Sequence, residues 1–145
     1  MEIKELKSME EMLTQLDVMQ QLYPTLNAKT YASMLGPMID LGYQQIAVFQ
    51  NDKCIALSGY WIGCKLWCGK YLEMDNVIVH PAHRTQGAAK YMAEYLEQKA
   101  LYEDCNILSL DAYTNNFQAH RFYYNQGYEP KGFHFVKTLN EEGLR

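Results

Sequence analysis

The sequence predicts a single α/β domain around a mixed sheet, with its elements in the order β-α-α-β-β-β-α-β-α-β. The 145 residues match the size of one domain with one core, and no repeat or Pro/Gly/Ser-rich linker divides them. Apolar residues follow a helical period before Gly42 and a strand-like period after it. Strands and helices then alternate, which indicates a β-α-β unit with two parallel strands. We therefore expect one domain over residues 1–145.

In the first part of the chain, Ser8 and Glu11 have the spacing of a capping box, which opens a helix that Pro24 ends. Gly42 is the expected stop of a second helix. Two strand-like runs flank the turn Asn51-Asp52-Lys53, which predicts an antiparallel hairpin. The elements expected here are a strand at residues 3–6, helices at 8–23 and 27–41, and strands at 45–50, 54–62 and 71–79.

The remaining residues alternate between helical and strand-like patterns. They predict a helix at residues 86–103, a strand at 106–112, a short helix at 116–125 and a closing strand at 128–139. Where two parallel strands separate, backbone groups are exposed and a ligand slot forms. We expect such a slot in the β-α-β unit.

Composition and charge exclude several classes of function. The chain is 48% hydrophobic and 21% charged, which is typical of a globular protein. A net charge of -4 argues against binding to nucleic acid, which depends on cationic contacts to phosphates. No apolar run reaches the roughly 18 residues that span a bilayer, and the N-terminus does not resemble a signal peptide. The four cysteines lack disulfide spacing, and Cys64-x-x-x-Cys68, which could be half a metal site, has no second Cys/His pair with partner spacing. We therefore expect a cytoplasmic protein with reduced thiols and no metal.

The segment over residues 77–89 carries the functional argument. It consists of a buried strand, a turn that contains Pro81, and an entry into a helix through small residues. The first turn of a helix offers free N–H groups and a partial positive charge, which together attract anions. Gly87 and the two alanines after it would let a phosphate approach the backbone closely, and His83 and Arg84 add positive charge. The alternative is a tightly packed turn that binds nothing.

Two motifs in this order resemble the GNAT superfamily of N-acetyltransferases. Arg84-x-x-Gly87-x-Ala89 is similar to the family's Arg/Gln-x-x-Gly-x-Gly/Ala signature, and the run over residues 77–81 is similar to its fourth strand. The segment over residues 116–128 is similar to the family's Asn-x-x-Ala-x-x-x-Tyr-x-x-x-Gly-Phe pattern, with Tyr128 in place of the usual Phe. Its matching positions are Asn116, Ala119, Tyr123 and Gly127.

The resemblance implies acetyl-coenzyme A (acetyl-CoA) as cosubstrate and assigns residues to it. By this resemblance, residues 1–70 form the acceptor side and residues 71–139 the cofactor-binding half. Asn116 would contact the pantetheine arm of the cofactor. The backbone of the preceding strand would hydrogen-bond this arm, through Val77, Ile78 and Val79. Amides of the loop would hold the pyrophosphate, through Arg84, Thr85, Gln86, Gly87, Ala88 and Ala89.

Acetyl transfer needs a proton donor for the departing sulfur, and Tyr123 holds the family's tyrosine position. A phenol with an ordinary pKa of about 10 can donate such a proton. Tyr124 is the alternative, because adjacent helical residues point about 100° apart and only one of them can face the sulfur.

The base that accepts the proton of the amine is a carboxylate in this hypothesis. Glu73 and Asp111 occupy positions at which different family members carry a glutamate, and either could act through a water. Asp75 lies on the same strand face as Glu73, so the pattern does not separate the two. Each of these residues could instead pair with a lysine or arginine. His134 titrates in a suitable range, but a single strand histidine is more often structural.

The predicted function is therefore N-acetyl transfer from acetyl-CoA to a primary amine, of a small molecule or a protein, by direct transfer. The alternative is a catalytically inactive acyl-CoA-binding module with a regulatory or interaction role. A homodimer is compatible with the resemblance, although no pattern in the chain argues for it. The sequence does not identify the acceptor amine.

Overall fold

The computed structural model describes all of residues 1–145. The chain forms two compact units, Met1–Ser109 and Leu110–Arg145. The first unit holds most of the secondary structure, and the second contains one helix, one short 3-10 turn and a long extended segment. None of the helices is both long and apolar enough to cross a membrane.

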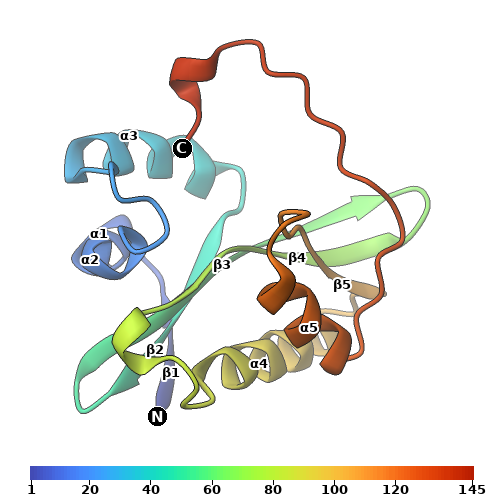
Figure 1. Cartoon of the computed structure of the whole chain (residues 1–145), viewed down its shortest axis with the longest axis horizontal. Coiled ribbons are helices and arrows are strands. Elements are labelled where there is room, and N and C mark those ends of the chain that lie inside the picture. Colours follow the sequence, from blue (N-terminus) through green and yellow to red (C-terminus); the bar gives the residue numbers. More distant parts are fainter. The chain divides into compact units, whose positions relative to one another are not determined.

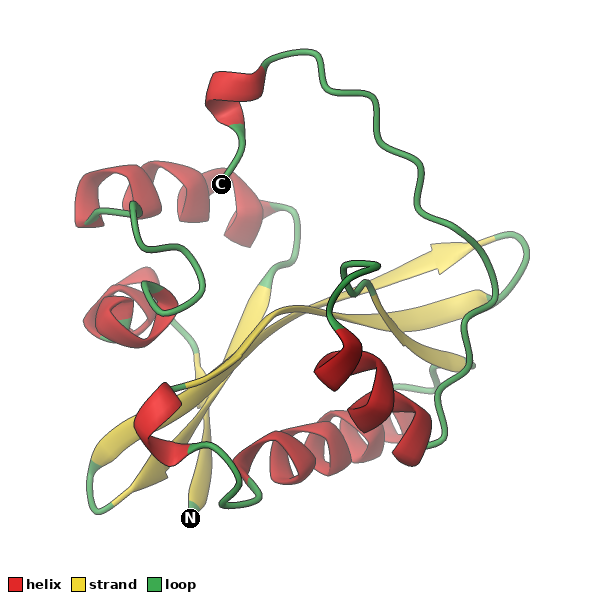
Figure 2. Cartoon of the chain, viewed as in Figure 1, coloured by secondary structure: helices red, strands yellow, loops and turns green.

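A five-stranded sheet forms the centre of the first unit, with its strands in sequence order from one edge to the other. The first four strands pair antiparallel, and the fifth follows a helical crossover, as expected for the β-α-β unit. The predicted mixed α/β class is confirmed (Figure 2). The strands are β1 (Glu2–Leu6), β2 (Gln44–Gln50), β3 (Lys53–Lys65), β4 (Gly69–Val79) and β5 (Ile107–Leu110).

Helices cover both faces of this sheet (Figure 1). On one face lie α1 (Met9–Thr14), α2 (Leu16–Met19) and α3 (Ala28–Asp40), and on the other lies α4 (Ala88–Tyr102). Alternation along the strands sends successive side chains to opposite faces, so each face has an apolar layer. The layer beneath α1, α2 and α3 includes Met12, Met19, Leu35, Ala47, Leu57 and Ile78.

The capping box predicted at Ser8 is confirmed. The Glu11 amide donates to the Ser8 hydroxyl at 3.1 Å, and the Ser8 amide donates to the Glu11 carboxylate at 3.0 Å. The single helix predicted over residues 8–23 is wrong in its extent, because the helix breaks at Gln15. There the Gln15 amide donates to the Met12 carbonyl three residues back, which tightens the last turn of α1 before α2 begins.

Both predicted turns in the middle of the chain are confirmed. Gly42 has φ +101°, and the next amide, of Tyr43, returns to the Met38 carbonyl at 2.9 Å to close α3. Asn51 and Asp52 both have positive φ, which matches the twist of a two-residue hairpin between β2 and β3.

In the second unit, α5 (Phe117–Asn125) is followed by an extended segment and a 3-10 turn at Glu141–Gly143. The closing strand predicted over residues 128–139 is wrong. An alternating pattern becomes a strand only where a neighbouring strand supplies ladder hydrogen bonds, and no strand pairs with these residues. Large apolar side chains in this segment are exposed, namely Phe133, Phe135, Val136 and Leu139.

Candidate functional site

A bulge interrupts β4 just before its last residues. Ile78 pairs with Leu57 of β3, whereas Asp75 pairs with Gly59, so Asn76 and Val77 together face a single residue of β3. Asn76 has φ +53° at this point. A bulge bends its strand and leaves the extra residue outside the ladder. Strand β4 therefore changes direction, and exposes backbone groups, where the sequence predicts contact with a ligand.

The other edge of β4 is open over the same stretch. The Asn106 amide donates to the Lys70 carbonyl at 2.7 Å, so β5 starts beside the beginning of β4. Strand β5 has four residues and β4 has eleven, so the end of β4 extends past its neighbour. Counted from the bond at Lys70, the four residues of β5 end before Val77, so this edge is left without a strand partner at Val77, Ile78 and Val79. An unpaired strand edge can hydrogen-bond an extended ligand as a further strand would.

The loop after β4 has the geometry of an anion cradle. After the 3-10 turn Pro81–His83, Thr85 has φ +64° and Gly87 has φ +88°. Gly87 is the N-cap of α4, and no side chain caps this end of the helix. The N–H groups of its first turn are therefore available to an external acceptor, and the helix dipole favours an anion there.

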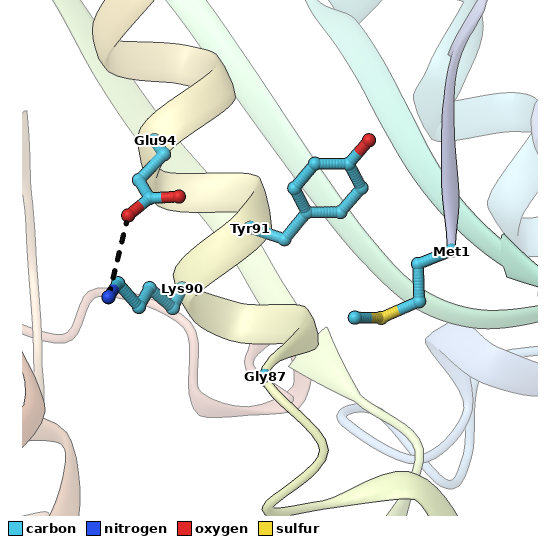
Figure 3. Close-up of a pocket in the computed structure, with 5 residues that line it drawn as sticks. All are labelled: Met1, Gly87, Lys90, Tyr91 and Glu94. Carbon is cyan, nitrogen blue, oxygen red and sulfur yellow. Dashed lines mark ion pairs between the residues drawn. The ribbon is translucent and has the colours of Figure 1, made fainter.

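The residues of the cradle fit a diphosphate. A Cβ atom at Gly87 would meet nothing closer than the Met1 Cε atom at 4.0 Å, so the backbone is open to close approach. The first turn of α4 contains no acidic residue, and Arg84 is exposed beside it. Next to this end of α4 is an open hollow of about 430 Å³ (Figure 3). It is lined by Met1, Gly87, Lys90, Tyr91 and Glu94.

Two carboxylates lie on the same face of β4, as alternation predicts. Glu73 pairs with Trp61 of β3, and Asp75 pairs with Gly59. The Trp61 indole N–H donates to the Asp75 carboxylate at 3.0 Å. Both carboxylates are half-buried, and both precede the bulge along the strand. The first unit thus contains the open strand edge, the cradle and one of the proposed bases, Glu73.

In the second unit, the Asn-to-Gly motif begins and ends a helix. The Asn116 side chain accepts a hydrogen bond from the Ala119 amide at 3.2 Å and so caps the start of α5. Gly127 has φ +88°, and the following amide, of Tyr128, donates to the Tyr123 carbonyl at 3.0 Å to close the other end. The first and last positions of the motif therefore define the length of α5.

Tyr123 and Tyr124 differ clearly in their surroundings. Tyr123 is half-buried, and its ring packs edge-on against Phe122 and Tyr128, with centroids 5.1 and 5.3 Å away. Burial raises the pKa of the Tyr123 hydroxyl to about 12. Tyr124 is 59% exposed. Tyr123 therefore remains a protonated phenol over the whole physiological range.

Asp111 is placed at the start of the second unit. Its carboxylate lies 3.0 Å from Nδ1 of His134, which comes from the extended segment. Both side chains are more than half exposed. The second unit thus contains Asp111, Asn116 and Tyr123.

The two motifs and the fold agree with a comparison to known families. A sequence model of the Acetyltransferase (GNAT) family matches residues 12–128. The chain belongs to the GNAT family. It is on that ground an acetyl-CoA-dependent acetyltransferase, as the resemblance of its motifs predicts.

Relatives of this GNAT chain extend over almost its whole length. It is 24% identical over 139 residues to the uncharacterized N-acetyltransferase YhdJ of Bacillus subtilis, covering 94% of this chain and 98% of that protein. Its fold is similar to that of glucosamine-6-phosphate N-acetyltransferase from Arabidopsis thaliana, with a TM-score of 0.76, 18% identity, and 96% and 98% of the two chains covered. It is also similar to AAC(6')-Iy in complex with the bisubstrate analog CoA-S-monomethyl-acetylneamine, with a TM-score of 0.79, 12% identity, and 97% and 99% covered.

One feature of this GNAT domain is absent from the sequence-based prediction, namely a polar network at the bulge of β4. Asn76 lies there between the hydroxyl groups of Tyr43 and Tyr23, at 2.8 Å from each. The signal that could have found it is the pair Asp75-Asn76 inside a strand pattern, because both residue types are depleted in strands and Asn tolerates positive φ.

Proposed function

We propose that this chain transfers the acetyl group of acetyl-CoA directly to a primary amine of a small molecule or a protein. One observation carries the proposal. The open edge of β4 at Val77 to Val79 leads directly into the uncapped first turn of α4 at Gly87. An extended amide-containing arm that ends in a diphosphate matches these two features in the same order.

In this proposal the backbone of β4 binds the arm, and the loop binds the diphosphate. Val77, Ile78 and Val79 provide N–H and C=O groups along the open edge. The amides of Arg84, Thr85, Gln86, Gly87, Ala88 and Ala89 surround the phosphates, and the Arg84 side chain adds a positive charge. Asn116 contributes a side-chain amide, whose oxygen caps α5. When bound, acetyl-CoA supplies the activated acetyl group.

We assign the proton donor to Tyr123. Its pKa of about 12, raised by burial, keeps the hydroxyl protonated at every pH at which the amine reacts. The exposed Tyr124 lacks this enclosure. The role of Tyr123 is therefore to hold a proton on its Oη atom for the departing sulfur.

We assign removal of the proton from the amine to Glu73 or Asp111, directly or through a water. Glu73 is on the strand that also provides the open edge, and its neighbour Asp75 is hydrogen-bonded by Trp61. Asp111 is paired with His134 instead. The variants Glu73→Gln and Asp111→Asn distinguish the two carboxylates. The variant that lacks the base should no longer show the pH dependence of kcat, and the other variant should keep it.

The proposal is tested by measuring thiol release from acetyl-CoA with a panel of amines. Two of the similar proteins are an acetyltransferase of an amino-sugar phosphate and an enzyme bound to an acetylneamine analog, so the panel should begin with amino sugars. Amine-dependent thiol release, with acetylated amine as product, supports the proposal. Tight acetyl-CoA binding with no release on any amine would instead favour a module that binds acyl-CoA without turnover.

A further inference from the structure

Asn76 is held by two tyrosines that come from distant parts of the first unit. The Tyr43 hydroxyl, just before β2, donates to the Asn76 side-chain oxygen at 2.8 Å. The Asn76 side-chain nitrogen donates to the Tyr23 hydroxyl, in the turn after α2, at 2.8 Å. Both ends of the amide are therefore engaged, and three segments meet at the bulge of β4.

A buried glutamine extends this network. Gln45 is only 1% exposed, and its side-chain nitrogen donates to the Tyr43 hydroxyl at 3.1 Å and to the Tyr31 hydroxyl at 2.7 Å. Because Tyr43 accepts from Gln45, its own proton is directed to Asn76. The Gln45 side-chain oxygen is buried without a hydrogen-bond partner, whereas both polar atoms of the Asn76 amide have one. Rotation of the Asn76 side chain away from the two tyrosines would break both bonds in a medium of low dielectric constant, so the network resists it.

Gly59 provides the space for Tyr43. A Cβ atom at Gly59 would lie 2.2 Å from the Tyr43 hydroxyl oxygen, so only glycine permits the ring to cross β3 at this point. Trp61 packs against the same ring, with centroids 5.1 Å apart. The Tyr43 ring is therefore packed between Gly59 and Trp61, with its hydroxyl group at Asn76.

The backbone of Asn76 needs such support. A non-glycine residue at φ +53° is strained by about 1 kcal/mol or more, and such residues persist where their surroundings determine their conformation. Asn is among the residues that tolerate this region best. The two side-chain hydrogen bonds thus fix the direction in which β4 leaves the bulge toward Val77.

The direction of the cofactor connects this bulge to the reaction, and this step rests on the proposed function. The cradle at Gly87 follows the end of β4, so a diphosphate bound there lies beyond Val79. An arm that runs back along the open edge passes Val79 first and Val77 last. Its acyl end therefore reaches the bulge, which is the end of the edge farthest from the cradle.

We propose that Asn76 is a positioning residue for acetyl transfer. Through its hydrogen bonds with Tyr43 and Tyr23, it fixes the backbone at Asn76 and Val77, against which the acyl end of the cofactor is aligned. It does not contact the diphosphate. The network therefore affects turnover more strongly than the affinity for coenzyme A, because it fixes only one of the binding residues, Val77.

The test compares Tyr43→Phe and Asn76→Gly with a matched control, Tyr60→Phe. Asn76→Gly keeps access to positive φ but removes both hydrogen bonds. Tyr60 is also buried and donates one hydroxyl hydrogen bond, to Gln44 at 2.9 Å, but has no part in the network. We expect kcat to fall about tenfold to a hundredfold in the two network variants, as small misplacements of reacting groups do. Coenzyme A affinity by calorimetry should fall less than kcat, by no more than about fivefold, and Tyr60→Phe should leave both values unchanged.

A second readout does not depend on turnover. In the wild-type chain, the backbone amide resonances of Asn76 and Val77 should shift differently with acetyl-CoA and with coenzyme A. This difference should disappear in Tyr43→Phe. Equal losses of kcat in Tyr43→Phe and Tyr60→Phe, or amide shifts that do not respond to the acetyl group, would overturn the inference. Absence of turnover in the wild-type chain would count against the proposed function, and the amide shifts would still decide the role of Asn76.

Discussion

At the scale of single residues, the hydroxyl group of Tyr123 is the proton donor that we propose. Replacing it as Tyr123→Phe removes one proton donor and almost no surface. We expect kcat to fall about a hundredfold, in the range typical of a lost general acid, with unchanged affinity for coenzyme A. Steady-state kinetics and calorimetry on the same preparation measure the two quantities.

The neighbouring residue provides the control for this prediction. Tyr124→Phe makes the same chemical change one position along α5, at a side chain that is 59% exposed. Its kcat should match the wild type. A loss of kcat in Tyr124→Phe together with normal turnover in Tyr123→Phe would transfer the role to Tyr124.

At the scale of elements, the junction between β4 and α4 is predicted to control cofactor binding. Gly87→Glu places a carboxylate at the uncapped helix end and adds a side chain at φ +88°. Repulsion of a diphosphate by a charge a few ångströms away corresponds to about 3 kcal/mol, so coenzyme A affinity should fall on the order of a hundredfold. Calorimetry measures this affinity, and circular dichroism checks that the fold remains.

Gly87→Asn separates the charge from the backbone effect. Asn tolerates positive φ and carries no charge, so this variant should retain more coenzyme A affinity than Gly87→Glu. Equal affinity of Gly87→Glu and wild type would exclude the cradle as the diphosphate site.

The crossing of Tyr43 over β3 gives a prediction for stability. In Gly59→Ala, the new Cβ atom would overlap the buried Tyr43 ring, which has no room to move. Such overpacking costs about 1–3 kcal/mol in the free energy of unfolding, measured by chemical denaturation. Gly132→Ala is the control, because a Cβ atom there meets nothing within 4 Å, and it should change stability by less than about 0.5 kcal/mol. A neutral Gly59→Ala would contradict the close fit of Tyr43.

Elements that depend on short-range rules could be predicted from the sequence. The capping box at Ser8, the stop at Gly42 and the hairpin turn at Asn51 each follow from residues within four positions of one another. The break at Gln15 could not be predicted, because no Gly or Pro marks it in the sequence and Gln is not a typical capping residue. The prediction of a strand over residues 128–139 was wrong because a strand requires a partner strand, which its own sequence does not specify.

The same distinction applies to the candidate site. The geometry around Gly87 is local, because a strand, a turn and a helix start follow one another, and the sequence predicted this order. The helix caps at Asn116 and Gly127 are local as well. The network at Asn76 joins residues 33 and 53 positions apart, and no periodicity connects them. Long-range polar contacts of this kind appear only once the sheet register is known.

At the scale of the whole molecule, one ion pair connects the first strand to the long helix of the β-α-β unit. Lys99 of α4 donates to the Glu5 carboxylate of β1, 94 residues away, and the Tyr95 hydroxyl donates to the same oxygen at 3.0 Å. The two charged side chains are 18% and 29% exposed, so water screens them only in part. The hydrogen bond from Lys99 outweighs the effect of burial and lowers the pKa of Glu5.

This lowered pKa predicts how stability depends on pH. A carboxylate whose pKa is lower in the folded chain stabilises it above the pKa of the unfolded chain, about 4.3, and this contribution is lost as pH falls through the folded pKa. Glu5→Gln should therefore reduce the free energy of unfolding by about 1 kcal/mol at pH 7, and the difference from wild type should shrink as pH falls below about 4.

Glu94→Gln removes an exposed carboxylate from the pair with Lys90 and should show no such pH-dependent difference. Urea titrations of the three proteins at several pH values measure it. If the curves of wild type and Glu5→Gln stay parallel down to about pH 3, the pair does not stabilise the fold through the charge of Glu5.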